Sequence, residues 1–239
     1  MSAQLPLSLS HSVRYSSASF VEHAGVRSTI VTLKALSAQR GFSLAYIMGP
    51  KGSGKTHLGV CLVGKLHEEQ GRDARFVSGR DLAEWYAQEL LERPFQGGEV
   101  LVIDDADRAL EELAQGGEPG IFVDIVERLA NADGMLVLLG ASVPERIRCG
   151  SQASSRLSAG LHFAIGDPQD ADLDGLLDLM TKQRGLHLTE SKRSYILRRV
   201  TRTLPALVAC VERLEKGGDF ESPSTSFELI AGAITTTAR

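Results

Sequence analysis

A glycine-rich turn between a strand-like run and a helical run carries a lysine and a threonine side by side. Residues 49–56 read Gly-Pro-Lys-Gly-Ser-Gly-Lys-Thr and match the pattern G-x-x-x-x-G-K-[ST] in full. Glycines let backbone N–H groups point into such a turn, and the start of the next helix adds the positive end of its dipole. This chemistry fits a polyphosphate with Mg²⁺: Lys55 would reach the β- and γ-phosphates, and the Thr56 hydroxyl would face the metal.

We therefore expect a nucleotide at this turn. The expected binding residues are Gly49, Pro50, Lys51, Gly52, Ser53, Gly54, Lys55, Thr56 and His57. Lys51 and Ser53 need no side-chain role, because their backbone N–H groups do the binding, and His57 needs no special role either. The alternative is a plain glycine-rich turn, but the strand before it and the amphipathic helix after it favour the phosphate loop.

Two carboxylates follow a second apolar run. Residues 100–103 are apolar, and Asp104 and Asp105 come directly after them. Ligands of parallel sheets gather at the carboxyl ends of the strands, which places both side chains at the edge expected for the phosphate loop. We expect Asp104 to hold Mg²⁺ through water and Asp105 to orient or deprotonate an attacking water. The alternative is a pair of solvated charges at a strand end.

Short apolar runs predict the sheet that must position these residues. They cover residues 44–48, 74–77, 100–103, 135–139 and 161–165. Helical spacing separates them, most clearly over 58–66 with Gly71 as a stop, and more weakly over 81–92 and 120–130. Alternating strands and helices predict an α/β fold in which a parallel sheet lies between helices.

The strand pattern stops near residue 168, and only helical patterns follow. They predict one helix around 173–180 that ends at Gly185, one that begins near Thr189, one over 204–214 with Pro205 in its first turn, and a short one at 227–234. We expect a loosely held tail at residues 1–18, an α/β core at 19–167 and an all-helical lid domain at 168–239.

Composition excludes several classes of function. A formal net charge of −4 and a pI near 5.9 do not favour tight nucleic-acid binding by the whole chain, although a local basic patch stays open. The three cysteines lack metal or redox spacing, and we expect reduced thiols. No apolar run approaches the length of a membrane span, and the N-terminus lacks an export signal, so we expect a cytoplasmic protein without a membrane partner.

Over nearly its whole length the chain resembles AAA+ P-loop ATPases, and more closely the DnaA and Hda family. Besides the two Walker motifs, Ser154-Ser155-Arg156-Leu157 resembles the family's box VII, and Thr201-Arg202-Thr203-Leu204 resembles its sensor 2 segment. The resemblance implies that Arg156 reaches a nucleotide bound by a neighbouring subunit and that Arg202 approaches the chain's own nucleotide. Each would otherwise be an exposed surface arginine. ATP or ADP with Mg²⁺ is the implied cofactor.

The tail carries a third resemblance. Gln4-Leu5-Pro6-Leu7-Ser8-Leu9 is similar to the hexapeptide with which Hda proteins bind the DNA polymerase sliding clamp. It implies partner-binding roles for Gln4 as polar anchor and for Leu5, Leu7 and Leu9, of which Leu7 and Leu9 are the apolar anchors. Without the resemblance, this stretch is a first strand or a disordered end. Phe20 and Val21 resemble the family's segment beside the adenine.

One motif departs from the family. Where a polar sensor 1 residue is expected after the fourth strand, the chain has Ala141, followed by Ser142. We therefore expect a weak intrinsic ATPase that acts mainly as a regulator.

The resemblance implies a protein that binds nucleotide and the clamp, meets DnaA, and stimulates hydrolysis of DnaA-bound ATP, thereby limiting the initiation of replication. It also allows a homo-oligomer through the family's subunit interfaces. We expect no dedicated DNA-binding domain, since the lid helices run to about residue 235. Two alternatives stay open: an adaptor that recruits DnaA or a helicase without stimulating hydrolysis, and an ATPase that loads a helicase.

Overall fold

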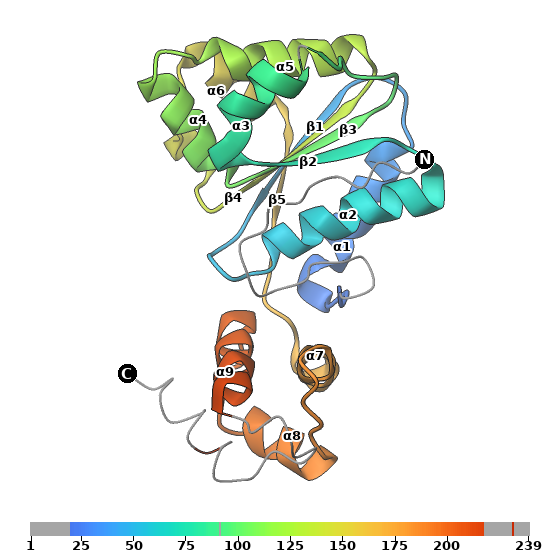
Figure 1. Cartoon of the computed structure of the whole chain (residues 1–239), viewed down its shortest axis with the longest axis vertical. Helices are drawn as coiled ribbons and strands as arrows, with labels where there is room; N and C mark the ends of the chain where they lie inside the picture. The colour runs from blue at the N-terminus through green and yellow to red at the C-terminus, as the bar shows by residue number, and fades with distance from the viewer. Residues whose placement is uncertain (1–19, 91, 218–230, 232–239) are drawn as a thin grey trace.

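A computed structural model describes residues 20–90, 92–217 and 231 of the chain (Figure 1). Parallel strands form one five-stranded sheet in the order β2-β3-β4-β1-β5. The strands are β1 (Ser43–Met48), β2 (Ala74–Ser78), β3 (Val100–Asp104), β4 (Met135–Gly140) and β5 (Leu161–Ala164). Each lies within one residue of its predicted ends, which confirms the parallel sheet.

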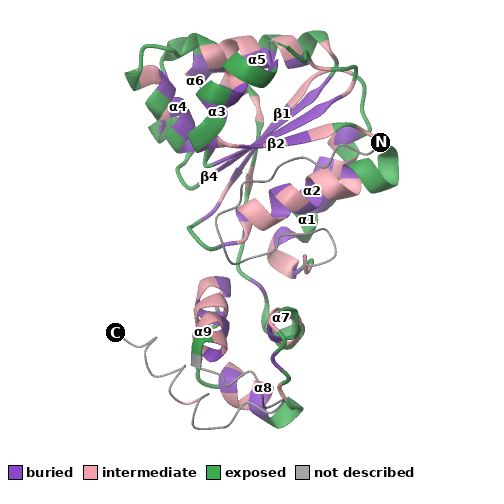
Figure 2. Cartoon of the chain, viewed as in Figure 1, coloured by how far each residue is buried: buried purple, intermediate pink, exposed green. Residues whose placement is uncertain are grey.

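Helices cover both faces of this sheet, as predicted (Figure 1). One face carries α1 (Ala24–Ser37) and α2 (Lys55–Gln70); the other carries α3 (Leu82–Trp85), α4 (Ala106–Gln115), α5 (Gly120–Asn131) and α6 (Ser151–Ala159). Because successive side chains of a strand point to opposite faces, Ala45 and Ile47 of β1 pack under α1 and α2, whereas Leu44 and Tyr46 pack under the other group. The central strands β3, β4 and β1 are buried along nearly their whole length (Figure 2), whereas β5 at the edge is mostly exposed.

The helix predicted at 81–92 is wrong as a single element. A short 3-10 turn and the four residues of α3 are followed by a π-helix at Tyr86–Leu90. Trp85 and Leu90 are both buried although they lie five residues apart. A π-helix, whose hydrogen bonds join residues five apart, brings such positions to one side more closely than an α-helix does. The helices α1, α4 and α6 were not predicted, whereas those over 58–66 and 120–130 are confirmed.

The helices of the lid are α7 (Asp170–Gln183), α8 (Glu190–Leu197) and α9 (Leu204–Gly217), which enclose a separate apolar core. Gly185, with a φ of 69°, follows α7, and Thr189 caps α8 by accepting from the Lys192 N–H at 3.4 Å. The predicted end of α7 and the predicted start of α8 are therefore confirmed. The helix predicted at 227–234 lies outside the described residues, Ala231 excepted. No helix in the described part of the chain is long and apolar enough to cross a membrane.

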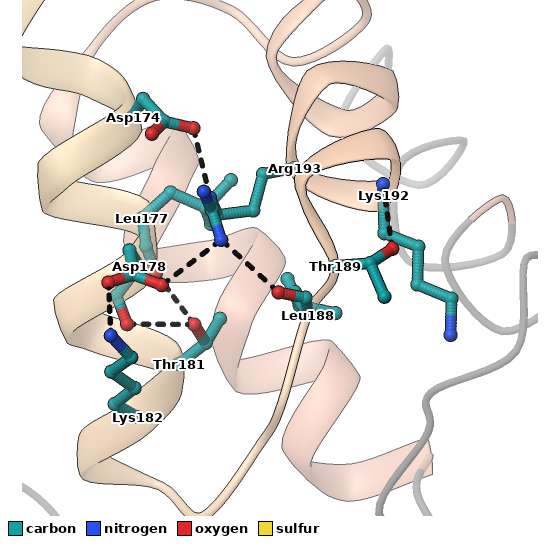
Figure 3. A network of polar contacts seen from close by, with 9 residues as sticks. All are labelled: Asp174, Leu177, Asp178, Thr181, Lys182, Leu188, Thr189, Lys192 and Arg193. Carbon is teal, nitrogen blue, oxygen red and sulfur yellow. Dashed lines mark hydrogen bonds and ion pairs between the residues drawn. The ribbon is translucent and has the colours of Figure 1, made fainter.

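A polar network fastens α8 to α7 inside the lid (Figure 3). The Arg193 guanidinium donates to Asp174 at 3.0 Å, to Asp178 at 3.2 Å and to the carbonyl oxygen of Leu188 at 3.2 Å. The Arg193 side chain is only 18% exposed. Three acceptors around one partly buried cation make this arginine a fixed part of the lid.

The first turn of α1 attaches the lid to the core. The Ala24 N–H donates to the Asp172 carboxylate of α7 at 3.0 Å, and the Gly166 N–H donates to the Gly25 carbonyl at 3.0 Å. A Cβ atom on Gly25 would lie 2.1 Å from the Gly166 carbonyl oxygen. Glycine is therefore required at position 25, where the backbone passes directly against the segment that leads into the lid.

All three cysteines are free and buried, as predicted. Burial raises the pKa of the Cys61, Cys149 and Cys210 thiols, which keeps them protonated. They pack as small apolar side chains and are poor candidates for chemistry.

A buried ion pair joins the amino ends of β2 and β3. Arg75 donates through Nε and a terminal nitrogen to both carboxylate oxygens of Glu99, and the two side chains are 5% and 0% exposed. The Gln96 N–H also donates to Glu99 at 2.9 Å. The Arg75 guanidinium lies 4.6 Å from the ring centre of Phe95 and 5.5 Å from that of Trp85. Removing only one partner of such a buried pair costs much stability, because the other charge is left buried without a partner.

Replacing Glu99 by alanine is expected to lower the free energy of unfolding by about 3–5 kcal/mol, because it leaves the Arg75 charge buried without its partner. Urea denaturation of both proteins measures this. The double substitution Arg75→Met with Glu99→Leu removes both charges and should recover most of the loss. A single substitution that costs less than about 1 kcal/mol would contradict this account.

Candidate functional site

The predicted phosphate loop connects β1 to α2. Gly52 and Gly54 have φ values of 82° and 91°, in the left-handed region that favours glycine. At Gly49, a Cβ atom would lie 2.7 Å from the Ser53 hydroxyl oxygen, so a larger residue there would require Ser53 to move. Gly49 and Ser53 are buried, whereas Pro50, Lys51 and Gly52 are exposed. The turn is therefore tight and open to solvent on one side.

Lys55 holds this loop in shape from inside. Its ammonium donates to the carbonyl oxygens of Gly49 at 2.7 Å and Pro50 at 3.0 Å. An ammonium has three donors, so one remains to face an anion. Burial lowers the pKa of Lys55, and the carboxylate of Asp104 opposes that shift. Lys55 thus places its ammonium group inside the loop.

Thr56 and Asp104 meet beside the loop, where a metal was predicted. The Thr56 hydroxyl donates to Asp104 Oδ2 at 2.7 Å. Burial raises the pKa of Asp104, although the Thr56 hydrogen bond works against it.

Asp104 Oδ1 and Ser53 Oγ are buried without a hydrogen-bond partner among the described residues. Buried polar atoms in native proteins are nearly always paired, so these two atoms indicate room for a ligand or ion. No group of three or more His, Cys, Asp or Glu side chains in the described part of the chain could enclose a metal by itself. This suits Mg²⁺, which keeps waters and phosphate oxygens among its ligands. The residues present fit a magnesium-bound polyphosphate.

Asp105 is turned away from its neighbour. Its backbone is left-handed, with φ 48° and ψ 39°, and its side chain is exposed, whereas that of Asp104 is buried. Aspartate is one of the few non-glycine residues that adopt this conformation readily. The turn therefore gives the two adjacent carboxylates different surroundings, which would allow the two roles expected from the sequence.

Asp107 is a third carboxylate at this edge, and sequence reasoning missed it. Its Oδ2 accepts from the backbone N–H groups of Ala141 at 3.0 Å and Ser142 at 2.9 Å. It thereby ties α4 to the end of β4, where the polar sensor 1 side chain was expected. Ala141 and Ser142 are exposed. In the sequence Asp107 is an acidic residue at the start of a helix, and nothing there shows that it meets Ala141, 34 residues along the chain.

The aromatic ring of Phe20 reaches the start of α2. It meets the ring of His57 edge to face, with the ring centres 5.1 Å apart and an interplanar angle of 85°. Val21 is half-buried beside it in the chain. Of the two residues expected beside the base, Phe20 therefore lies next to the phosphate loop, in contact with His57.

The lid lies directly over the loop. A Cβ atom on Gly52 would be 3.2 Å from Pro205 Cγ, and one on Gly54 would be 3.3 Å from Leu204 Cδ2. Arg202 precedes these residues and donates to the carboxylate of Asp170, the first residue of α7. Arg202 is therefore close in sequence to Leu204 and Pro205, which cover the loop. Its guanidinium, however, is paired with a carboxylate of the lid.

Arg156 lies elsewhere. It belongs to α6 and donates to Glu127 of α5 at 2.5 Å and to the Gln152 carbonyl at 3.4 Å. Together with residues at the amino ends of β1 and β5, such as Leu44 and Leu161, it lines a cavity of about 400 Å³. Since β1 leads from this cavity to the phosphate loop, the two regions are about 15–20 Å apart along the strand. The predicted clamp-binding residues 4–9 lie outside the described residues.

Solved structures with a similar fold are replication initiators and a branch migration motor. Domain III of DnaA from Thermotoga maritima matches with a TM-score of 0.73 and 15% identity, over 93% of this chain and 96% of that one. AMPPCP-bound DnaA from Aquifex aeolicus matches with a TM-score of 0.62 and 19% identity, over 86% and 66%. The RuvB Holliday junction branch migration motor of T. maritima gives 0.61 and 17%, over 93% and 72%.

The chain therefore has the AAA+ P-loop NTPase fold, with a DnaA-like arrangement of its elements. No protein-family model matches it.

The Asp107 bonds predict a pH-dependent stability. Burial alone would raise the pKa of Asp107, but the Ser142 and Ala141 N–H groups outweigh it and lower the pKa. A lowered pKa contributes stability in full above the unfolded value of about 3.9, and that contribution is lost as the pH falls through the folded value. Asp107→Asn should cost about 1–3 kcal/mol at pH 7, and its difference from the natural chain should shrink below about pH 4.

Urea denaturation at pH 7 and at steps down to about pH 3 measures this difference. Asp105→Asn is the matched control, because it removes one charge from an exposed neighbour and keeps a residue type that tolerates the left-handed backbone. A difference between Asp107→Asn and the natural chain that stays constant across this pH range would contradict the account.

Proposed function

We propose that this chain is a regulatory AAA+ protein of the Hda type. It binds ADP or ATP with Mg²⁺, docks on the DNA polymerase sliding clamp, and stimulates hydrolysis of the ATP bound by DnaA. One observation carries the proposal: a complete phosphate cradle occupies one end of β1, while the arginine that resembles an arginine finger, Arg156, lies at the other. An arginine so far from its own cradle suits the nucleotide of a neighbour.

The nucleotide site rests on the residues around the loop. Lys55 would offer its remaining donor to the phosphates, and Thr56 with Asp104 would hold Mg²⁺. Phe20 and His57 would lie near the base. Adenine nucleotide is supported by the similar Aquifex aeolicus DnaA, which was solved with AMPPCP bound.

The role of Arg156 rests on its accessibility and its present partner. Its side chain is 30% exposed, and that of Glu127 is 59% exposed. Exposed ion pairs contribute little to stability, so Arg156 can exchange this carboxylate for a phosphate at small cost. A guanidinium suits that exchange because it stays charged and its forked donors match phosphate oxygens.

Clamp binding rests on the tail alone. Leu7 and Leu9 would enter an apolar groove of the clamp, with Gln4 as polar anchor and Leu5 beside it. Bound there, the chain would be concentrated next to DNA that has just been replicated, where it would meet DnaA. The subunit interfaces of the AAA+ family would also allow two copies of this chain to associate.

An autonomous ATPase that loads a helicase is the second candidate. The exposed Asp105 at the carboxyl edge of the sheet, beside the Thr56–Asp104 pair, favours it, because these residues could activate a water in this chain's own site. Ala141 counts against it, since it offers no polar side chain at the sensor 1 position.

Lys55→Ala is expected to raise the Kd for ADP and ATP by at least about tenfold, because it removes a charged donor from the phosphates. Calorimetric titration in the presence of Mg²⁺ measures this. Lys51→Ala is the matched control: it removes an exposed lysine from the same loop and should leave the Kd nearly unchanged. An intact chain that binds neither nucleotide would end the proposal.

Arg156→Ala should abolish the stimulation of DnaA's ATPase by this chain and DNA-loaded clamp, since arginine fingers contribute on the order of 10³ to 10⁵ in rate. It should still be retained in a pull-down on purified clamp. Arg128→Ala, which removes another surface arginine paired to a carboxylate, is the control and should stimulate normally.

The paired change Leu7→Ala and Leu9→Ala should lose both clamp retention and stimulation. Full stimulation by Arg156→Ala would contradict the arginine-finger role, whereas clamp retention of the unaltered chain without any stimulation would favour the adaptor function. Turnover by the chain alone that Asp105→Asn removes would favour the helicase loader.

A further inference from the structure

We propose that Asp170 competes with bound nucleotide for Arg202, and that this competition lowers the affinity of the phosphate loop. The inference rests on the nucleotide site of the proposed function and concerns a residue that no sequence motif singled out. Asp170 acts through Arg202 and is therefore a positioning residue.

The Asp170–Arg202 pair is placed to break easily. The Arg202 guanidinium donates to Asp170 Oδ2, and the two side chains are 56% and 70% exposed. Water can replace each partner, so the pair has little stability of its own. No other hydrogen bond or ion pair of the Arg202 side chain is found among the described residues.

Arg193 is an example of a lid arginine that several partners hold in place (Figure 3). It is 18% exposed and has carboxylate partners in Asp174 and Asp178 and a backbone partner in Leu188. Arg202 differs in both exposure and number of partners. Arg193 is therefore fixed in the lid, whereas Arg202 is free to change partner.

Arg202 is also close enough to the loop for such a change. It lies two positions, or about 7 Å of chain, before Leu204, whose side chain covers Gly54 of the phosphate loop. Pro205 covers Gly52 in the same way. A phosphate held by the loop therefore lies beneath the segment that carries Arg202.

Carboxylate and phosphate compete for the same donors of a guanidinium. In the structure Asp170 accepts from a donor of Arg202, and a nucleotide must displace it. The displaced carboxylate stays solvated at the start of α7, where its negative charge also opposes the approach of the phosphates. Both effects weaken nucleotide binding, and both disappear when the carboxylate is removed.

The test is the affinity of the full chain for AMPPCP with Mg²⁺, measured by calorimetric titration. Asp170→Asn should lower the Kd about two- to fivefold, the range expected for releasing an exposed ion pair. In an Arg202→Ala background the same change should have a smaller effect, because the competition is gone. Arg202→Ala alone should raise the Kd.

Asp174→Asn is the matched control. It removes the same charge from the same helix and also breaks a bond to an arginine, but that arginine is Arg193. It should leave the Kd unchanged. Each variant changes exposed residues, and thermal unfolding verifies that it is folded before titration.

The inference is overturned if Asp170→Asn raises the Kd or leaves it unchanged, or if its effect is equally large without Arg202. An Arg202→Ala chain with normal affinity also overturns it. These outcomes leave the nucleotide site of the proposed function intact. Absence of AMPPCP binding by the unaltered chain would instead reject that site, and the role of Asp170 with it.

Discussion

The site depends on one ammonium inside a tight backbone turn. Lys55 bonds to the carbonyl oxygens of Gly49 and Pro50, which closes the loop across its base. These two bonds hold the loop in its shape from inside. Gly49 packs closely against Ser53, and Gly52 and Gly54 supply left-handed backbone. The packing of α2 on the sheet, with Leu58 and Leu62 buried, fixes the helix start that carries Lys55.

The parallel sheet sorts charged groups to its two ends. At the carboxyl end of its central strands lie Lys55, Asp104 and Asp107, all of them buried. At the amino end lie the Arg75–Glu99 pair and Arg156. The Arg75–Glu99 pair holds β2 and β3 together, whereas Arg156 faces solvent beside a cavity. The two ends of the sheet thus carry different groups, with the residues of the phosphate loop at the carboxyl end and Arg156 at the amino end.

Local patterns allowed the sheet, the phosphate loop and the lid helices to be predicted, because each is encoded by neighbouring residues. Prediction failed where the deciding contact is distant. The π-helix at Tyr86–Leu90 follows from the burial of Trp85 and Leu90, which the sequence cannot show. Asp107 reads as a helix-start acid, and only the fold brings Ala141 to it. The pairing of Arg202 with Asp170 joins residues 32 apart. Short α4 and α6 carry many small or polar residues, which weakens their helical period.

The close approach of Gly25 to Gly166 has a mechanical consequence. Ala24 is bonded to Asp172 of the lid, and four residues earlier Phe20 touches His57 at the start of α2. The first turn of α1 thus connects Phe20, beside the start of α2, to the lid helices beyond residue 168. Because no side chain at position 25 separates the two backbone segments, a small tilt of that turn would be transmitted directly to the lid helices.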